Sequence, residues 1–423
     1  MKKKDTVVDS GPPQIPISSK SKSKRGGHLT SKCHRVYIRT FGCQMNEHDS
    51  GRVRDMLLDS GYAMTDDPAG ADVLLFNTCS VRKNAEDRVF GVVSSLKAVK
   101  KKRPRVVFGI LGCMAEARKQ DIFAGMGHVD FICGPADLDK VPKILKKVFS
   151  GDSRLMYVGG HKSGRLPGFS KKRRQGKTAY VKIAEGCNNF CSYCIVPYVR
   201  GRERSRPSRD ILREIRDLVN NGTRDIILLG QNVNSYGKGL KEKIDFPGLL
   251  KKIDKVVRRD CPPSGEAAGF ASLAMTKVKV SFVTSHPKDA GTGLFKAVAG
   301  LKSLSKQLHL PLQSGSNKIL KRMNRGYTVG KYKKLVKDFR NIVKDGRILS
   351  DFIVGFPGET KKDFNETLKA VKEVRFNSAY IFKYSPRPFT KAAELKDNIP
   401  EKEKERRHKI LLDAQRKISR KNI

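Results

Sequence analysis

Three cysteines lie within eight residues of one another in the segment EGCNNFCSYCIVPYVRGRERSRP, residues 185–207. Thiolates are good ligands for iron–sulfur clusters and for zinc. A zinc ribbon would need a second C-x2-C pair at a suitable distance, and no such pair follows. Three thiols on a cubic cluster leave its fourth iron open, much as catalytic zinc sites keep one position open. The segment therefore predicts a 4Fe-4S cluster held by Cys187, Cys191 and Cys194, with one iron free to bind a substrate.

A second group of three cysteines is spread over the first third of the chain. Cys43, Cys79 and Cys113 each lie at or just beyond the end of a predicted strand. Because the C-terminal ends of parallel strands meet at one edge of a sheet, these residues can converge. Each cysteine alone would more often be a buried core residue. Their shared position predicts a second three-thiol site. The remaining cysteines lack such company and are expected to be incidental: Cys33, Cys133 and Cys261.

Short apolar runs alternate with amphipathic segments between Val36 and about residue 150. One such segment, residues 50–60, has Val53, Met56 and Leu57 on one helical face. Alternating strands and helices predict a parallel sheet covered by helices on both sides. The predicted strands are residues 36–39, 73–77, 106–111 and 129–133.

A second series of strands and helices follows a basic, glycine-containing connector. Helices are expected after Ser208 and after a capping arrangement of Thr360 with Asp363. Six β/α units favour an incomplete barrel over an open sheet, with the active groups at the C-terminal strand ends. The six predicted strands are residues 179–184, 225–230, 277–284, 307–312, 348–354 and 378–384.

The domain boundaries follow from these patterns. A loop insertion is expected at residues 256–276, which are rich in small residues and proline. The expected order is a disordered basic tail at 1–34, an N-terminal α/β domain at 35–150, a linker at 151–176, a barrel domain at 177–405 and a charged C-terminal helix at 406–423.

The charge of the chain points to a polyanionic partner. Its 87 Lys and Arg residues against 42 Asp and Glu give a net charge of +45, which favours RNA or DNA over a membrane surface. A general bias of the source toward lysine is the alternative. There is no long apolar run and no secretory signal, so no membrane association and a cytoplasmic location are expected. Nine cysteines, an odd number in a long chain, argue against a disulfide framework.

The C-x3-C-x2-C spacing, with Tyr193 before the third cysteine, resembles the radical S-adenosylmethionine (SAM) superfamily. With both cysteine groups considered, the chain resembles its methylthiotransferase family from about residue 35 to about residue 418. Within that family it is most similar to the branch that modifies N6-isopentenyladenosine in tRNA. The matching blocks, in the family's order, are TFGCQMNEHDS, FNTCSVRKNAEDRVFG, EGCNNFCSYCIVPYVRGRERSRP, LLGQNVNSYG, TSHP, HLPLQSGSNKILKRMNRGYT and DFIVGFPGET.

This resemblance implies a fold and a reaction. The fold is an N-terminal α/β methylthiotransferase domain followed by a partial (β/α)6 radical SAM barrel. The cluster at Cys187, Cys191 and Cys194 would bind SAM and reductively cleave it to a 5′-deoxyadenosyl radical. A second 4Fe-4S cluster at the other three cysteines would carry the sulfur, which another SAM methylates. The radical would take hydrogen from C2 of the adenine, which is neither acidic nor electrophilic enough for acid–base chemistry, so no acid–base residue is expected.

Further residues receive weaker assignments. Tyr193 belongs to the cluster motif, and Ile353 and Gly355 are expected to let the backbone approach the adenine of SAM. Polar residues after the barrel strands are expected to contact SAM or the substrate base, with turn formation as the alternative. These polar residues are Gln231, Ser285 and Gln313. His286 has no visible metal partner and is expected to be structural.

Four arginines follow the cluster segment at alternate positions. In an extended segment they would share a face, and guanidinium groups bind phosphate oxygens with two hydrogen bonds. The arginines therefore predict an RNA contact, with a solvated basic loop as the alternative. They are Arg200, Arg202, Arg204 and Arg206.

The resemblance also implies partners. The expected substrate is the anticodon arm of a tRNA, and the expected electron donor is a flavodoxin or ferredoxin; the sulfur donor is not predicted, and a monomer is expected. The family normally ends in a small RNA-binding β-barrel, the TRAM domain, and this sequence stops about where that domain should begin. Alternative functions are the same chemistry on threonylcarbamoyladenosine or on a ribosomal protein, and a non-catalytic iron–sulfur RNA-binding protein.

Overall fold

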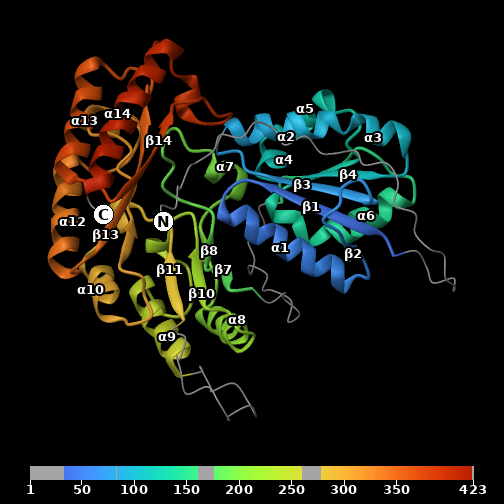
Figure 1. The fold of residues 1–423 in the computed structure, drawn as a ribbon, viewed down its shortest axis with the longest axis horizontal. Helices are drawn as coiled ribbons and strands as arrows, with labels where there is room; N and C mark the ends of the chain where they lie inside the picture. Colours follow the sequence, from blue (N-terminus) through green and yellow to red (C-terminus); the bar gives the residue numbers. More distant parts are fainter. Residues whose placement is uncertain (1–32, 82, 161–175, 260–277, 422–423) are drawn as a thin grey trace, which may run out of the picture. The chain divides into compact units, whose positions relative to one another are not determined.

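The fold was obtained as a computed structural model, which describes residues 33–81, 83–160, 176–259 and 278–421. The chain forms two compact units that divide after Gly160 (Figure 1). Among the described residues, no helix is both long enough and apolar enough to cross a bilayer. The N-terminal tail predicted at 1–34 lies almost wholly outside the described residues, as does Cys261.

The first unit is built on a parallel sheet, as predicted, but the sheet has six strands where four were expected. The strand order is β2-β1-β3-β4-β5-β6. Successive side chains of a strand point to opposite faces, and Leu74 and Phe76 enter one core while Val73 and Leu75 enter the other. The strands are β1 (Arg35–Phe41), β2 (Ala63–Met64), β3 (Val73–Thr78), β4 (Val107–Gly112), β5 (Phe131–Cys133) and β6 (Leu155–Tyr157).

Helices cover both faces of this sheet (Figure 1). The core on one face includes residues of α2, α4 and α5, and the core on the other includes residues of α1 and α6. A sheet covered on both sides explains why β3 is buried along its whole length. The helices are α1 (Gln44–Asp59), α2 (Lys83–Ser95), α3 (Lys97–Lys102), α4 (Cys113–Arg118), α5 (Gln120–Gly125), the 3-10 helix η1 (Pro135–Lys140) and α6 (Val141–Phe149).

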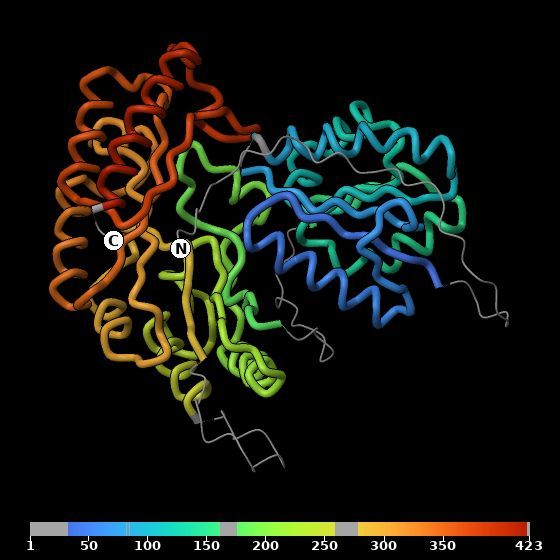
Figure 2. The backbone as a smooth tube through the Cα atoms, in the orientation of Figure 1, coloured from blue at the N-terminus to red at the C-terminus, as the bar shows by residue number. Residues whose placement is uncertain are grey.

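The second unit contains the six predicted strands in two parallel sheets of three, β11-β10-β7 and β12-β13-β14. A parallel bridge between Val280 and Leu304 connects β11 to the segment before β12. One core receives side chains from all six strands, as expected for an incomplete barrel. Figure 2 shows the course of the backbone through this unit. The strands are β7 (Thr178–Lys182), β10 (Asp225–Leu229), β11 (Lys279–Phe282), β12 (Gln307–His309), β13 (Arg347–Val354) and β14 (Ser378–Lys383).

Helices follow the barrel strands. Thr360 and Asp363 form the predicted capping box of α13. Ser208 is the first residue of α8 and not its cap, because its hydroxyl donates to Glu242 Oε2 at 2.6 Å. The long helices are α8 (Ser208–Asn220), α9 (Phe246–Arg259), α10 (Thr292–Gly300), α12 (Val329–Ile342), α13 (Lys361–Val374) and α14 (Glu401–Lys421). The short elements are β8 (Ala184–Glu185), α7 (Val196–Arg200), β9 (Arg204–Ser205), η2 (Val233–Ser235), η3 (Pro287–Asp289), α11 (Asn317–Arg322) and η4 (Lys391–Glu394).

Three predicted boundaries differ from the observed elements. The predicted linker at 151–176 contains β6, a three-residue edge strand too short to give a periodic signal. Helix α9 continues to Arg259, so the insertion predicted at 256–276 begins with helical residues and otherwise lies outside the described ranges. The boundary predicted between residues 405 and 406 falls inside α14. This helix begins at Glu401, directly after a proline.

Candidate functional site

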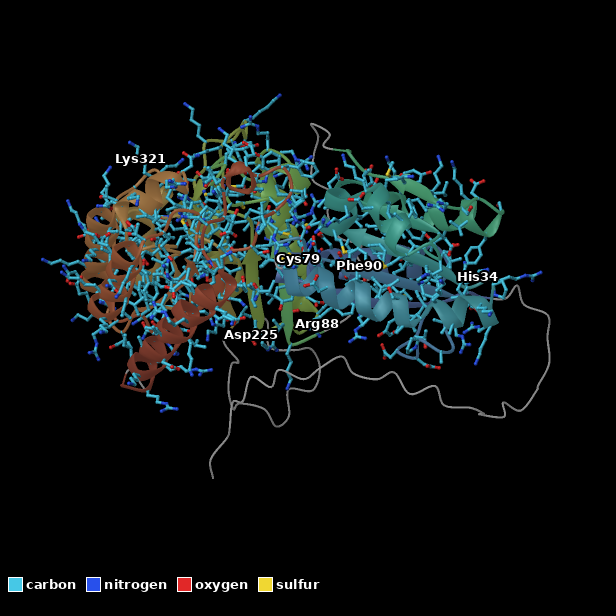
Figure 3. All side chains as sticks on the ribbon, turned by 90° about the horizontal axis from the view of Figure 1, so that it is seen from above. His34, Cys79, Arg88, Phe90, Asp225 and Lys321 are labelled. Atoms are coloured by element: carbon cyan, nitrogen blue, oxygen red, sulfur yellow. The ribbon has the colours of Figure 1, made fainter. Side chains whose placement is uncertain are left out.

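The first thiol group gathers at the C-terminal edge of the first sheet. Cys43 follows β1, Cys79 follows β3 and Cys113 follows β4, and these three strands are neighbours. In Figure 3, Cys79 and His34, which precedes β1, lie at opposite ends of the unit. The pKa of Cys79 is raised well above its usual value by a hydrogen bond with Cys43, by burial and by the charges of Cys43 and Cys113. The predicted convergence of the three thiols is therefore present.

Two asparagines and a glycine hold this edge together. Asn46 Oδ1 accepts a hydrogen bond from Cys43 Sγ at 3.2 Å, and Asn46 Nδ2 donates to Asn77 Oδ1 at 3.0 Å. Gly112, which leads into Cys113, has φ of 90°, and a Cβ there would lie 2.2 Å from Asn77 Oδ1. Only glycine suits such a backbone. The asparagines were not predicted, because their contact joins positions 31 residues apart.

The second thiol group lies in the loop between β8 and α7. Burial, followed by the neighbouring charge of Cys191, raises the pKa of Cys194 to about 12. The pKa of Cys187 is also raised, chiefly by burial and in part by Cys191. The three thiols are thus close enough to affect one another. Without a bound cluster, both of these half-buried thiols favour their neutral form, and the iron of a cluster would favour the thiolate.

The arginine segment returns to support this loop. Strand β9 pairs antiparallel with β8, and Cys187 N–H donates to the Gly201 carbonyl at 3.2 Å. Gly186 has φ of 83°, and a Cβ there would lie 2.2 Å from the Arg202 carbonyl oxygen. The loop between β8 and α7, called the cluster loop below, therefore packs directly on the backbone of the RGRERS segment. This proximity explains why the basic run follows the cysteines so closely.

The four predicted arginines divide into two pairs. Arg200 and Arg206 have side chains only 2% exposed and form ion pairs with Glu185 at 2.9 Å and Glu214 at 2.7 Å. These two arginines stabilise the loop from within and are not available to a phosphate in this structure. Arg202 is exposed, with its guanidinium carbon 4.4 Å from the centre of the Phe190 ring. Arg204 is partly exposed and lies 3.8 Å from Glu185.

The polar residues expected to contact SAM lie after the barrel strands. Gln231 Oε1 accepts a hydrogen bond from Gly186 N–H at 2.6 Å, so this side chain fixes the start of the cluster loop. Ser285 Oγ and Gln313 Oε1 are buried and have no hydrogen-bond partner among the described residues. Buried polar atoms are normally satisfied, so these two oxygens are open to a hydrogen bond from a ligand or from water. Gln313 also has a left-handed φ of 72°, an uncommon conformation that clusters at ligand sites.

The loop after β13 is closed by a carboxylate. Gly355 has φ of 71°, and its N–H donates to Glu359 Oε2 at 2.8 Å. Ile353 N–H donates to the Gln313 carbonyl at 3.0 Å, which ties this strand end to that of β12. Ile353 and Gly355 thus belong to the same group of strand ends as the two unsatisfied oxygens.

A buried polar group around Cys191 was not predicted. Arg325 Nη1 lies 3.3 Å from Cys191 Sγ and 3.3 Å from Tyr193 Oη. His286 Nδ1 accepts from Lys288 N–H, which leaves the proton on Nε2, 3.9 Å from Cys191 Sγ. Burial and the charges of Arg325 and Lys288 lower the pKa of His286 to about 2, so this side chain is neutral. His286 is the N-cap of η3, where its ring accepts the Lys288 N–H, and this agrees with the structural role expected for it.

Both donor sets consist of three thiols. Within the described ranges, no three His, Cys, Asp or Glu side chains are grouped closely enough to hold one metal ion. Each site offers three mutually interacting thiols, the ligand type that iron–sulfur clusters prefer. Both sites are thus compatible with a cluster that has one open iron.

Two family models match the chain. The model described as "Uncharacterized protein family UPF0004" matches residues 35–134, and "Radical SAM superfamily" matches residues 181–371. Among solved structures, the radical SAM methyltransferase TsrM from Kitasatospora setae is similar with a TM-score of 0.62 and 12% identity, over 85% of this chain and 75% of that chain. At this identity the likeness shows the fold alone.

The curated relatives are much closer in sequence. The tRNA-2-methylthio-N(6)-dimethylallyladenosine synthase of Clostridium novyi (strain NT) is 43% identical over 391 residues, which are 92% of this chain and 82% of that protein. The protein of the same name from Carboxydothermus hydrogenoformans is 44% identical over 385 residues, 90% of this chain and 83% of that protein. With both cysteine groups in place and this identity over nine tenths of its length, the chain belongs to the tRNA-2-methylthio-N(6)-dimethylallyladenosine synthase family of radical SAM proteins.

Proposed function

We propose that the protein is a tRNA methylthiotransferase that converts N6-dimethylallyladenosine next to the anticodon to its 2-methylthio derivative. The observation that carries this proposal is the presence of two separate three-thiol groups, one at the strand ends of each unit. A protein that only binds RNA through one iron–sulfur cluster needs neither the second group nor an open iron. The names of the curated relatives supply the substrate, N6-dimethylallyladenosine in tRNA.

The two sites divide the work in this proposal. Cys187, Cys191 and Cys194 would hold the 4Fe-4S cluster that binds SAM, and Cys43, Cys79 and Cys113 would hold the auxiliary 4Fe-4S cluster. When bound, the first cluster supplies one electron and a coordination site for SAM, and the second supplies a place for the sulfur. The protein supplies the thiolates, their fixed positions and a buried setting.

The SAM site is supported by the unsatisfied oxygens at the barrel strand ends. Ser285 Oγ and Gln313 Oε1 would accept hydrogen bonds from the bound molecule, which removes the cost of their burial. Gln231 acts indirectly, because its carbonyl oxygen already accepts from Gly186 N–H. The backbone at Ile353 and Gly355 would approach the adenine of SAM, and Tyr193 would position the loop through Arg325.

The RNA contact is proposed for the two arginines that solvent reaches, Arg202 and Arg204. Both follow the cluster loop directly, and the net charge of +45 favours a polyanion throughout. An unpaired base of an anticodon arm can be turned out into a pocket, as single-stranded RNA recognition requires. A flavodoxin or ferredoxin as electron donor, a monomeric state and a cytoplasmic location complete the proposal.

The test is mass spectrometry of tRNA nucleosides. Cells that lack this gene should accumulate N6-dimethylallyladenosine without its 2-methylthio derivative, and the wild-type gene should restore the derivative. A gene with Cys191→Ala should not restore it, whereas Cys133→Ala, at a buried cysteine outside both groups, should. Loss of a methylthio group from threonylcarbamoyladenosine instead, or unchanged nucleosides, would reject the proposed substrate.

A further inference from the structure

The cluster loop is held from a second side by a segment far along the chain. Residues 322–325 begin with the last residue of α11, and the Met323 carbonyl oxygen accepts a hydrogen bond from Ser192 N–H at 3.0 Å. Asn324 Nδ2 donates to the Phe190 carbonyl at 3.0 Å, across 134 residues of sequence. Asn324 itself has a left-handed φ of 55°. This segment, RMNR, therefore forms a clasp on the loop that presents Cys191.

Arg325 is the last residue of the clasp and is almost completely buried, with 4% exposure. Its Nη1 lies 3.3 Å from Cys191 Sγ and from Tyr193 Oη. Its Nε donates to Tyr327 Oη at 2.8 Å, and its Nη2 donates to the Pro311 carbonyl at 2.9 Å. These contacts hold the flat guanidinium group in one orientation, with one edge toward the thiol.

The charge of Arg325 has no carboxylate partner among the described residues. Three other buried arginines do have one: Arg200, Arg206 and Arg407 lie 2.7–2.9 Å from a glutamate oxygen. A buried cation is strongly unfavourable unless an anion compensates it. The groups that face Arg325 are Cys191, Tyr193 and Tyr327, and of these the cysteine is the proposed cluster ligand. The missing anion is therefore expected to arrive with the cluster.

We propose that Arg325 is the charge partner of the loaded cluster at Cys187, Cys191 and Cys194, and that it raises the reduction potential of that cluster. This inference rests on the cluster assignment made under the proposed function. A cubic cluster with three thiolates carries a net negative charge, and reduction adds one further negative charge. A fixed cation and a hydrogen bond to a ligand sulfur both stabilise the more negative, reduced form. Arginine keeps its proton, so this effect does not depend on pH.

The test is a redox titration followed by electron paramagnetic resonance. The parent protein is the full chain with Cys43, Cys79 and Cys113 changed to Ala, so that a single cluster gives the signal. In this parent, Arg325→Met should lower the equilibrium constant for one-electron reduction at least tenfold, a shift of about 59 mV to more negative potential. Arg325→Lys keeps the charge and should stay within tenfold of the parent.

Asn324→Ala is the matched control, because it weakens the clasp without changing charge. It should lower the amount of iron bound but leave the potential of the remaining cluster unchanged. If Arg325 served only the fold, Arg325→Met would behave in the same way, and an unchanged potential in that variant would overturn the inference.

If Arg325→Met binds no cluster, the potential of the Arg325→Lys variant tests the charge role. A cluster retained with a potential close to that of the parent supports the charge role, whereas its loss or a shift beyond tenfold contradicts it. A parent that binds no cluster at all would reject the cluster assignment itself, which is a separate outcome.

Discussion

The C-terminal helix is fastened to the loop after β13 by a buried ion pair. Arg407 Nη1 lies 2.7 Å from Glu359 Oε2 and donates to the Glu359 carbonyl at 2.9 Å. The two side chains are 6% and 0% exposed. Burial raises the pKa of Glu359, while the Gly355 N–H and Arg407 lower it. Arg407→Met would leave this carboxylate buried with its cationic partner removed.

The expected cost is about 3–5 kcal/mol in the free energy of unfolding, the usual result of removing one partner of a buried pair. The control is Arg406→Met on the next residue. Arg406 is 51% exposed and pairs with Glu403, so its loss should cost less than about 1 kcal/mol. The pKa of Glu359 is already raised by its burial, and loss of Arg407 should raise it further. The free energy of unfolding of the variant is then retained at low pH and falls as the pH rises. The difference in this free energy between variant and wild type should therefore widen between pH 5 and pH 8.

The assay is urea unfolding of the cluster-free protein by circular dichroism, with hydrogen exchange of the peptide containing Gly355. Because the chain has two units, the exchange data are needed to assign the loss to this loop. Arg407→Met should expose the Gly355 amide to exchange, and Arg406→Met should not. Equal destabilisation by the two substitutions, or a difference that narrows as the pH rises, would show that the buried pair does not stabilise this loop.

Two further predictions concern the cysteines and the arginines. In the folded protein without a cluster the pKa of Cys194 is raised to about 12, whereas the unfolded chain keeps the ordinary value of 9.0. The free energy of unfolding therefore falls as the pH rises above 9.0. By pH 10 the loss should be roughly 1.4 kcal/mol, visible as a steeper fall in Tm than in Cys194→Ala; parallel curves would contradict it. In tRNA binding, Arg202→Ala with Arg204→Ala should lower the log–log salt slope by about two, measured by filter binding between 50 and 200 mM salt. Arg209→Ala, at a side chain 75% exposed, is the control. An equal fall in the salt slope in this control would contradict a specific RNA contact of Arg202 and Arg204.

The sequence was sufficient for the fold and for the positions of the thiols. Strong apolar runs such as 73–77 and 225–230 predicted central strands, and three cysteines that each follow a strand predicted a common edge. The edge strands β2 and β6, with two and three residues, were too short for any period to be visible. Local patterns thus identified the elements that are buried and missed those at the margins.

The contacts around the thiols could not be predicted, since they join distant positions. Arg325 contacts Cys191 across 134 residues, and the Asn46–Asn77 contact spans 31. Alternate spacing predicted one exposed face for the arginines, but Arg200 ends a helix and Arg206 turns inward to Glu214. Which charges are paired inside and which meet solvent depends on the fold around them, and spacing alone carries no such information.

The proposed division of roles between the two thiol groups can be tested by turnover of the reconstituted protein with reductant, SAM and a tRNA that carries N6-dimethylallyladenosine. The products to measure by mass spectrometry are 5′-deoxyadenosine and the 2-methylthio nucleoside. The wild-type protein should give both products, and a variant with Cys187, Cys191 and Cys194 changed to Ala should give neither. A variant with Cys43, Cys79 and Cys113 changed to Ala should give 5′-deoxyadenosine alone. A methylthio nucleoside formed by either variant would contradict the division of work between the two thiol groups.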